Sequence, residues 1–298
     1  MKSLLYNILY NKHINFFLRN FIMFINKLFG LNFILHPSGI LKVNLDNNKV
    51  IYFKTNQTSY VTVKLFWEGY KNFEYSTIFF DLVKNINSFI DVGSNIGYYT
   101  VMGAFVNSNL KVISFEPSNG SFNYLSKNIR LNNLNDNVIL EKIALSDKIG
   151  YIEFYEVFNK KYPLIDNLSG EHNIGTKKLK SNIATKVKTI TLDKYVSVNN
   201  INNLDLIKLD TEGSEYLIMQ KGINALIKFQ PIIICEILIN SINRSLIDDF
   251  IKKINYNIYY HKNKKLIKVS SVQKTIIKGV SDYFFVHPSK EHLIKKYL

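Results

Sequence analysis

The chain has 298 residues, of which 47% are hydrophobic, so it can bury a sizeable core; it is long for one domain and short for two large ones. Its formal net charge of +15 favours acidic partners such as an anionic glycan, a nucleotide-sugar, nucleic acid or an acidic membrane surface, although lysines scattered over a solvated surface explain the charge equally well. The single cysteine, Cys235, excludes an intramolecular disulfide, and no apolar stretch reaches the roughly 18–20 residues that a membrane span requires.

Residues 1–70 are predicted to form an amino-terminal extension made of a helix and a β-hairpin. Residues 3–30 have a helical pattern, and residues 40–54 carry two β-like runs separated by an Asp-Asn-Asn turn. Charged residues interrupt the apolar stretches of residues 1–36 and no small-residue cleavage site follows them, so we do not expect a secretory signal. We expect this helix to dock on the body of the protein, with an amphipathic contact to a membrane surface as the alternative.

Residues 71–298 are predicted to form the main domain, which begins with a helical stripe over residues 74–86. Seven strands are then predicted at residues 88–92, 112–115, 138–143, 206–209, 232–237, 258–261 and 283–286, the last two as an antiparallel pair. Their alternation with helices predicts an α/β fold with a mostly parallel, doubly wound sheet of seven strands and helices on both faces. Residues 150–203 interrupt this alternation and are predicted to be an insertion that forms a lid or a substrate-selecting wall.

Residues 91–97, Asp-Val-Gly-Ser-Asn-Ile-Gly, carry the clearest functional signal. They close one apolar run, and Glu116 ends the next apolar run 19 residues after Gly97. A glycine loop after one strand and a carboxylate after the next are typical of a nucleotide-type cofactor site. Asn95 and Tyr98 stand where a dinucleotide loop has glycine, which disfavours NAD and FAD. A smaller zwitterionic group, such as the methionine end of S-adenosylmethionine, suits the loop better; a turn without a ligand is the alternative, and the two acidic residues argue against it.

Acidic residues recur at the carboxyl ends of the predicted strands, which is the edge where α/β sheets bind ligands. They are Asp91, Glu116, Asp147, Asp210 and Glu236. We expect Asp91 to hold the loop N–H groups and attract an ammonium group, Glu116 to accept from a ribose diol, and Asp147 to accept from an adenine amine. The predicted cofactor-binding set combines these three residues with Gly93, Asn95 and Gly97 of the loop.

A second motif, Lys-Leu-Asp-Thr-Glu-Gly-Ser-Glu at residues 208–215, follows the fourth strand. Strand alternation puts Lys208 and Asp210 on the same side of the sheet, and Glu215 opens a helix, where it complements the helix dipole. Methyl transfer to oxygen needs a base for the hydroxyl proton, or a metal ion that lowers its pKa. The predicted catalytic residues for either task are Asp210, Glu212 and Glu236, with His172 of the insertion as an alternative base. No tight His/Asp spacing is present, so no metal site is predicted.

Together these motifs resemble the FkbM-type family of S-adenosylmethionine-dependent methyltransferases over roughly residues 74–236. The matching parts, in the family's order, are residues 89–100, Phe-Glu-Pro at 115–117, Ala-Leu-Ser-Asp at 144–147, Thr-Leu-Asp at 191–193 and residues 207–215. The resemblance implies a Rossmann-like methyltransferase fold and O-methylation of hydroxyl groups, typically on sugars of surface polysaccharides or on natural products. It also implies that Glu74, on the helix before the loop, lies near the methionine ammonium group.

We therefore predict an S-adenosylmethionine-dependent O-methyltransferase that acts on a glycan or another small molecule, with an anionic acceptor as one option. The expected location is cytoplasmic, with peripheral contact at the inner membrane surface as an alternative. An RNA methyltransferase is a second hypothesis, favoured by the net charge; however, the dense basic clusters at residues 177–180 and 262–265 lack interleaved aromatic side chains, which argues against a nucleic-acid partner. A non-catalytic membrane-associated module is a third hypothesis, and it leaves the acidic residues at the sheet edge unexplained.

Overall fold

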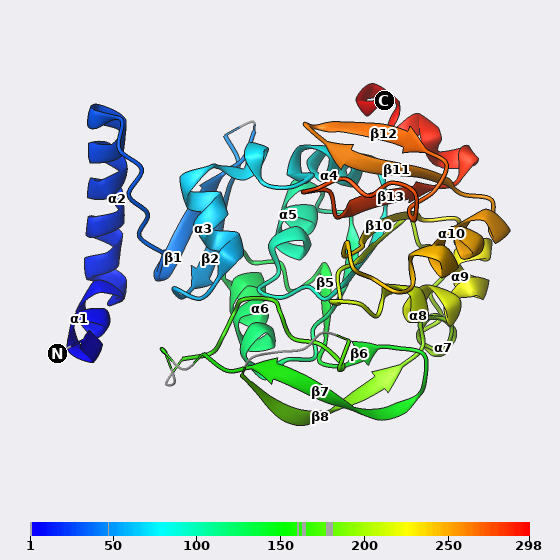
Figure 1. Ribbon diagram of the computed structural model, residues 1–298, viewed down its shortest axis with the longest axis horizontal. Coiled ribbons are helices and arrows are strands. Elements are labelled where there is room, and N and C mark those ends of the chain that lie inside the picture. The colour runs from blue at the N-terminus through cyan, green and yellow to red at the C-terminus, as the bar shows by residue number, and fades with distance from the viewer. Residues whose placement is uncertain (1, 47, 160, 163–164, 177–180) are drawn as a thin grey trace.

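One large sheet with helices on both faces forms the centre of the computed structural model, which describes residues 2–46, 48–159, 161–162, 165–176 and 181–298 (Figure 1). The strand order is β12-β11-β13-β10-β9-β3-β4-β5. The bounds are β3 Ser88–Val92, β4 Lys111–Phe115, β5 Val138–Glu141, β9 Leu206–Leu209, β10 Ile232–Glu236, β11 Asn257–Lys262, β12 Lys265–Val269 and β13 Asp282–Val286. The strands from β10 to β5 pair in parallel, and β13, β11 and β12 continue the sheet antiparallel at the β10 edge.

The predicted α/β fold is confirmed, but the sheet has eight strands instead of seven. All the predicted strands are present. The additional strand, β12, forms a hairpin with β11 around Asn263 and Lys264, whose φ angles of 52° and 63° are both positive. Leu266 is the only buried residue of β12, so this edge strand lacks the apolar alternation from which a strand is predicted.

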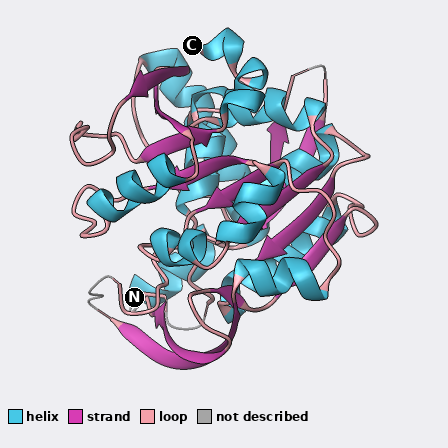
Figure 2. Cartoon of the chain, turned by 90° about the vertical axis from the view of Figure 1, so that its right-hand side faces the viewer, coloured by secondary structure: helices cyan, strands magenta, loops and turns pink. Residues whose placement is uncertain are grey.

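The helices divide between the two faces of the sheet, as Figure 2 shows. On one face lie α4 Ser76–Leu82, α5 Tyr98–Val106 and α6 Asn119–Leu131; on the other lie α7 Leu192–Val198, α8 Glu215–Gln220, α9 Ile223–Phe229 and α10 Arg244–Lys253. Alternate residues of each strand belong to two separate hydrophobic cores, because the side chains of neighbouring residues point to opposite faces of the sheet. In β3, Phe89 belongs to the first core, whereas Ile90 and Val92 belong to the second.

The amino-terminal segment consists of α1 Lys2–Leu9, α2 Lys12–Phe29, the hairpin β1 Gly39–Asn44 and β2 Val50–Thr55, and α3 Tyr60–Trp67. The predicted single helix is divided into two, because the Asn11 side chain accepts the N–H groups of His13 and Ile14 and thereby starts α2. The predicted hairpin is confirmed, and its alternate apolar residues join the first core. Asn128 of α6 and Asn132, which follows the end of that helix, also bond the backbone of β2. The domain boundary at residue 70 stays a prediction.

The insertion forms a small second sheet together with the short strand that precedes it, in the order β6-β8-β7. Its strands are β6 Ala144–Leu145, β7 Gly150–Val157 and β8 Asn182–Ile190. Strand β8 ends where the Thr191 side chain accepts the N–H of Lys194 and caps α7. The basic cluster at residues 177–180 lies outside the described residues. Short 3-10 helices lie at Tyr70–Asn72, Val83–Asn85, Pro288–Leu293 and Lys295–Tyr297.

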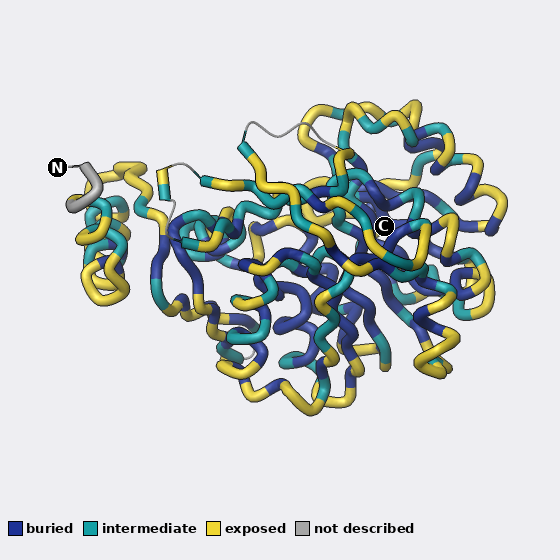
Figure 3. The backbone as a smooth tube through the Cα atoms, turned by 90° about the horizontal axis from the view of Figure 1, so that it is seen from below, coloured by how far each residue is buried: buried dark blue, intermediate teal, exposed yellow. Residues whose placement is uncertain are grey.

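Burial differs sharply between the sheet and the amino-terminal helices. Buried residues gather in the centre of the molecule, while α1 and α2 are mostly exposed or half-buried (Figure 3). Helix α2 packs through the polar residues Asn15 and Arg19, which bond residues 36–40 of the amino-terminal segment itself, and its expected docking on the main domain stays a prediction. No helix among the described residues has the length and apolar character needed to cross a membrane.

Candidate active site

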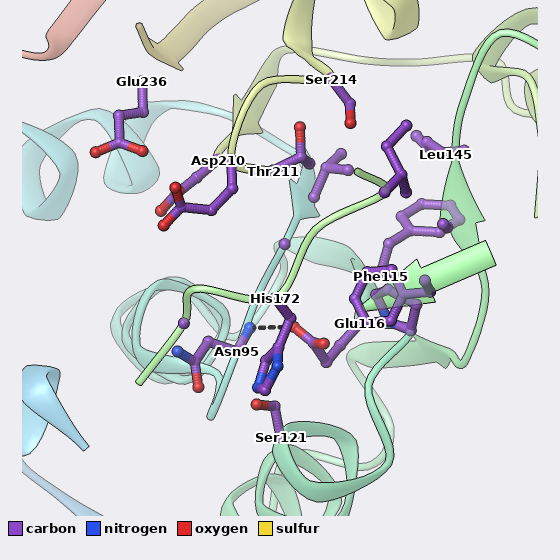
Figure 4. Close-up of a pocket in the computed structure, with 18 of the residues that line it drawn as sticks. Asn95, Phe115, Glu116, Ser121, Leu145, His172, Asp210, Thr211, Ser214 and Glu236 are labelled. Carbon is purple, nitrogen blue, oxygen red and sulfur yellow. Dashed lines mark hydrogen bonds between the residues drawn. The ribbon is translucent and has the colours of Figure 1, made fainter. Parts of the chain in front are cut away.

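A pocket opens where β3, β4, β9 and β10 end (Figure 4). Seven of the residues predicted for the site line it, namely Glu74, Gly93, Asn95, Glu116, Asp210, Glu212 and Glu236. The insertion supplies one wall, formed by Phe154, Ser169, Gly170, His172 and Ile174. The other three predicted residues, Asp91, Gly97 and Asp147, do not line the pocket.

The loop after β3 is held by hydrogen bonds within the protein. The N–H groups of Gly93 and Ser94 donate to the Phe115 carbonyl at 3.0 and 3.1 Å. The N–H of Asn95 donates to the Glu116 carboxylate at 2.8 Å (Figure 4). These N–H groups therefore fix the loop against the end of β4, and a ligand does not meet them directly.

Asp91 lies beneath the loop, where it is 1% exposed. One of its carboxylate oxygens accepts a hydrogen bond from the Thr100 hydroxyl at 2.6 Å, and the other lies 3.8 Å from Lys208 Nζ. The prediction that Asp91 holds the loop N–H groups is wrong, because those of Gly93 and Ser94 donate to the Phe115 carbonyl and that of Asn95 donates to Glu116. Burial raises the pKa of Asp91, while the Lys208 cation and the Thr100 hydroxyl oppose that increase.

Gly93 and Gly97 lie where any side chain would clash with a neighbouring residue. Both have positive φ angles, 73° and 86°. A Cβ atom on Gly93 would lie 1.8 Å from the carbonyl oxygen of Asp210, and one on Gly97 would lie 2.4 Å from Cδ1 of Leu125. These close approaches bring the ends of β3 and β9 together under the pocket and seat the start of α5 against α6.

Carboxylates gather at one end of the pocket. Asp210 accepts a hydrogen bond from Lys208 Nζ at 3.0 Å, which confirms that these two side chains share one side of the sheet. Glu74 lies just before α4 instead of on it, with a φ of 42°, and accepts from the Tyr99 hydroxyl at 2.8 Å. Although Glu74 is open to the pocket, protein atoms crowd its carboxylate; this loss of hydration, with the charge of Asp210, raises its pKa to about 7.

Asp282 is a residue of this acidic end that the sequence did not reveal. The antiparallel register of β10 and β13 pairs it with Glu236. Parallel strands end at this edge of the sheet, whereas an antiparallel strand begins there, so the first residue of β13 joins the group. Burial, with the charges of Asp210 and Glu212, raises the pKa of Glu236 to about 10, and burial also raises the pKa of Asp282 well above its usual value.

Lys208 is the second residue that the sequence analysis left without a role in the site. Its side chain is 5% exposed and lies beneath the acidic end, in contact with Asp91 and Asp210. Its Nζ also lies 5.7 Å from the centre of the Tyr99 ring. The sequence signal was available, because Lys208 stands two residues before Asp210 on a buried strand.

The pocket also has apolar lining residues, namely Phe115, Ile143, Leu145, Phe154 and Ile174. Figure 4 shows Phe115 and Leu145 at the end of the pocket away from Asp210 and Glu236. Glu116 lies between this end and the carboxylates (Figure 4). Two buried polar atoms of lining residues, Asn95 Oδ1 and Ser121 Oγ, have no hydrogen-bond partner, and a polar ligand in the pocket would satisfy them. Asp147, two residues beyond Leu145, accepts a hydrogen bond from Ser146 and stays outside the lining.

His172 lines the pocket, but both of its ring nitrogens are engaged by the backbone. Nδ1 accepts the N–H of Val157 at 2.9 Å, so Nε2 carries the hydrogen and donates to the Asn167 carbonyl at 3.2 Å. The neutral imidazole has no free lone pair in this arrangement. The alternative of His172 as the base is therefore disfavoured.

The turn after β9 is fixed by Glu215. Its carboxylate accepts the N–H groups of Thr211 and Gly213 and the hydroxyl of Thr211, at 2.8 to 3.1 Å. Glu215 starts α8 and has a structural role, as predicted. Glu212 lies in the turn with a φ of 58° and lines the pocket. Within the described part of the chain, no group of three His, Cys, Asp or Glu side chains is arranged to hold a metal ion.

Comparison with known proteins relates this chain to methyltransferases. The family model for the methyltransferase FkbM domain matches residues 91–258, which is more than half of the chain. Hexuronic acid methyltransferase AglP of Haloferax volcanii is 29% identical over 136 residues, which are 46% of this chain and only 50% of that protein. A crystal structure of methyltransferase FkbM from Methylobacillus flagellatus KT superposes with a TM-score of 0.46 and 16% identity, covering 75% of this chain and 52% of the other. A precorrin-6y C5,15-methyltransferase from Geobacter metallireducens GS-15 superposes with a TM-score of 0.43 and 8% identity, covering 82% of this chain and 97% of the other. The chain belongs to the FkbM methyltransferase family, and its eight-stranded sheet is the Rossmann-like methyltransferase fold.

Proposed function

We propose that this methyltransferase moves a methyl group from S-adenosylmethionine to a hydroxyl group of a glycan or another small-molecule acceptor. The observation that carries the proposal is the polarity of the pocket, which runs from an apolar end, past Glu116, to an end rich in carboxylates. S-adenosylmethionine has the same sequence of groups: an adenine ring, a ribose diol, and a methionine end whose ammonium and sulfonium cations outweigh its one carboxylate.

The residues of each part of the pocket fit the corresponding part of this donor. Phe115 and Leu145 offer apolar surface to an adenine ring, and the carboxylate oxygens of Glu116 retain lone pairs for ribose hydroxyls beside the bonds that hold the loop. Glu74 and Asp210 offer negative charge to the cationic end. Asp91 supports this end from below through Lys208, instead of by direct contact. A role for Asp147 at the adenine would require it to turn toward the pocket.

The acceptor would bind in a second cavity next to the donor pocket. Tyr60, Glu74, Asp210 and Glu236 line both cavities, so the two communicate at the acidic end. Bound S-adenosylmethionine would supply an electrophilic methyl group at this junction. One of Asp210, Glu212 and Glu236 would then act as the base that takes the proton of the acceptor hydroxyl. Asp210 is held in place by the Lys208 cation. The raised pKa of Glu236 keeps its carboxyl group protonated until a cation binds nearby.

Several lysines favour an anionic acceptor. Lys71, Lys262, Lys264 and Lys278 line the second cavity together with the carboxyl groups it shares with the donor pocket. The carboxyl groups suit the hydroxyl that reacts, and the lysines suit a carboxylate or phosphate elsewhere on the acceptor. The curated relative is a hexuronic acid methyltransferase, which supports an acidic sugar as the acceptor class.

Calorimetry with S-adenosylmethionine tests the donor site. Glu116→Gln and Asp210→Asn should each weaken binding by at least tenfold, because each removes a charged partner of the donor (about 1.5–3 kcal/mol). Asp136→Asn changes a surface carboxylate outside the pocket and should bind like the wild type. Circular dichroism and thermal unfolding would verify that the variants are folded. Wild-type affinity in both pocket variants would contradict the proposal.

A further inference from the structure

Helix α2 packs on the protein with its polar side and turns its apolar side to solvent. Asn15 and Arg19 are buried, whereas Phe17, Phe21, Phe24 and Leu28 are 60 to 71% exposed. These four residues stand at intervals of four, three and four positions, so they share one face of the helix. A helix that stabilises a globular fold shows the opposite arrangement, with its apolar face inward.

Hydrogen bonds anchor the polar side of α2 to the segment at residues 36–40. The Asn15 side chain donates to the His36 carbonyl at 3.0 Å and accepts the N–H of Ser38 at 2.8 Å. The Arg19 guanidinium donates to the carbonyls of Ser38 and Ile40 at 3.0 and 2.7 Å. These bonds fix the orientation of the helix, and the outward position of its phenylalanines follows from them.

The loop after α2 enlarges the exposed apolar surface. The Asn26 side chain bonds both the N–H and the carbonyl of Phe33, at 3.1 and 2.7 Å, and so holds this loop beside the end of the helix. Phe33 and Ile34 are each 61% exposed. We name the six residues Phe17, Phe21, Phe24, Leu28, Phe33 and Ile34 the amino-terminal apolar surface. Figure 1 shows α2 at the outer edge of the molecule, beyond the hairpin.

The charge of this segment identifies the kind of partner. The first acidic residue of the chain is Asp46, whereas residues 1–45 contain five lysine and arginine residues. Lys27 flanks the phenylalanines on α2, and it is exposed. An apolar face flanked by Lys27 and free of carboxylates complements a bilayer that contains anionic lipid. A symmetric contact between two copies would instead bring like charges together, because an isologous interface pairs each surface with itself.

We propose that the amino-terminal apolar surface inserts into the headgroup region of a membrane that contains anionic lipid, with α2 lying in the plane of the bilayer. The phenylalanines and Leu28 enter the boundary between headgroups and acyl chains, and Lys27 contacts lipid phosphates. The rest of the chain stays outside the bilayer, so the contact is peripheral. This partner is independent of the donor and acceptor proposed above.

Vesicle flotation with the full chain tests this inference. Wild-type protein should float with vesicles of phosphatidylcholine containing 30% phosphatidylglycerol, and much less with phosphatidylcholine alone. The triple variant Phe17→Ser, Phe21→Ser, Phe24→Ser should lose at least roughly tenfold in partitioning, since it removes most of the inserted area. The variant Lys27→Gln should lose roughly fivefold in partitioning on the anionic vesicles, whereas Lys12→Gln, on the packed side of the helix, should float like the wild type.

A matched control separates this surface from general hydrophobicity. The triple variant Ile149→Ser, Ile242→Ser, Ile276→Ser removes three apolar side chains that are 62 to 92% exposed elsewhere, and it should float like the wild type. Thermal unfolding would check the fold of each variant. The proposal is overturned if wild-type protein does not float, or if the phenylalanine variant is folded and floats equally well. Light scattering that shows a dimer of the wild type, a monomer of the phenylalanine variant and no flotation would identify a second copy as the partner and also overturn it.

Discussion

Lys208 is the residue that connects the core of the sheet to the acidic end of the pocket. Burial by itself would lower the pKa of this amine, but the charges of Asp210 and Asp91 outweigh burial and raise it. The side chain is therefore a permanent cation between two carboxylates. It compensates the buried charge of Asp91 and orients Asp210 toward the pocket.

Removing this cation should destabilise the protein. In Lys208→Met, Asp91 becomes a buried carboxylate without a counter-charge, and the loss of one partner of a buried ion pair costs about 3–5 kcal/mol. Urea unfolding at pH 7 measures this loss. The loss should be smaller near pH 5, because an uncompensated buried carboxylate is protonated more readily than in the wild type.

A second substitution tests the origin of that effect. Lys208→Met with Asp91→Asn should recover part of the lost stability, since the uncompensated charge is removed. Lys228→Met, which removes an exposed lysine, should stay within about 0.5 kcal/mol of the wild type. Equal stability of Lys208→Met and Lys228→Met would contradict the role assigned to Lys208.

Glu74 should make donor binding depend on pH. Crowding of the carboxylate by protein atoms and the charge of Asp210 raise its pKa to about 7, so the carboxylate is mostly protonated at pH 6 and mostly ionised at pH 8. A cationic ligand prefers the ionised form. The affinity for S-adenosylmethionine should therefore rise between pH 6 and pH 8, by at most about tenfold per pH unit below the pKa.

The variant Glu74→Gln isolates this contribution. Calorimetry should find weaker binding at pH 8 and a flatter pH profile than in the wild type. The amino group of the ligand titrates in the same range with both proteins, so the difference between the two profiles belongs to Glu74. If Glu74→Gln retains the full pH dependence, the titrating group is another one.

At the scale of elements, the pocket depends on how closely the strand ends approach each other. The loop after β3 passes directly over the end of β9, with Gly93 against the Asp210 carbonyl. The loop is tied to β4 by the bonds to Phe115 and Glu116. Three strand ends are thus held in one arrangement before any ligand binds, which places Glu116 and Asp210 in the same pocket.

Gly93→Ala tests this approach, and Gly69→Ala is its matched control. The two glycines have nearly the same φ, 73° and 74°, but no atom lies within 4 Å of a Cβ built on Gly69. Gly69→Ala should therefore cost only the backbone strain of about 1–2 kcal/mol. Gly93→Ala adds a clash with backbone atoms, so the strand ends must separate.

The expected result for Gly93→Ala is a loss of stability greater than that of Gly69→Ala by about 2 kcal/mol or more, together with loss of donor binding. Thermal unfolding and calorimetry of the two variants measure both effects. Similar unfolding curves for the two variants would show that the loop can move away from Asp210 at little cost.

At the scale of the whole molecule, four of the lysines behind the net charge of +15 line the proposed acceptor cavity beside its acidic residues. Lys71, Lys262, Lys264 and Lys278 come from segments far apart in the chain. Their charges attract an anionic group of an acceptor, and this attraction weakens with ionic strength. The residues that interleave these lysines include no stacked aromatic track, so the cavity suits a small acid better than a nucleic acid.

The double variant Lys262→Ser, Lys278→Ser should raise the KM for an anionic acceptor such as a hexuronic acid. We expect roughly a two- to fivefold increase per lysine at low salt, because partly exposed charge pairs contribute up to about 1 kcal/mol each. The KM for a neutral sugar should not change. Lys228→Ser with Lys295→Ser, two exposed lysines outside the cavity, is the control. An equal effect on neutral and anionic acceptors would contradict this assignment.

Local sequence patterns predicted most of the framework correctly. The inner strands were found because residues such as Phe89 and Ile90 must alternate between two cores, and the helix starts were marked by residues such as Glu215. The edge strand β12 was missed, because at an edge only Leu266 needs to be buried. The division of the first helix at Asn11 was missed, because a cap depends on which backbone groups its side chain reaches.

The sequence by itself determined the family, the α/β fold and the set of carboxylates at the edge of the sheet, because strand alternation and the glycine loop are local properties of the chain. Only the tertiary structure decided the position and the role of each carboxylate. Register placed Glu116 over the loop, buried Asp91 against Lys208, and brought Asp282 next to Glu236 across an antiparallel pair. The tertiary structure also decided that the phenylalanines of α2 face outward, since hydrogen bonds to residues 36–40 orient the helix. These outcomes depend on contacts between residues distant in sequence, which no local pattern encodes.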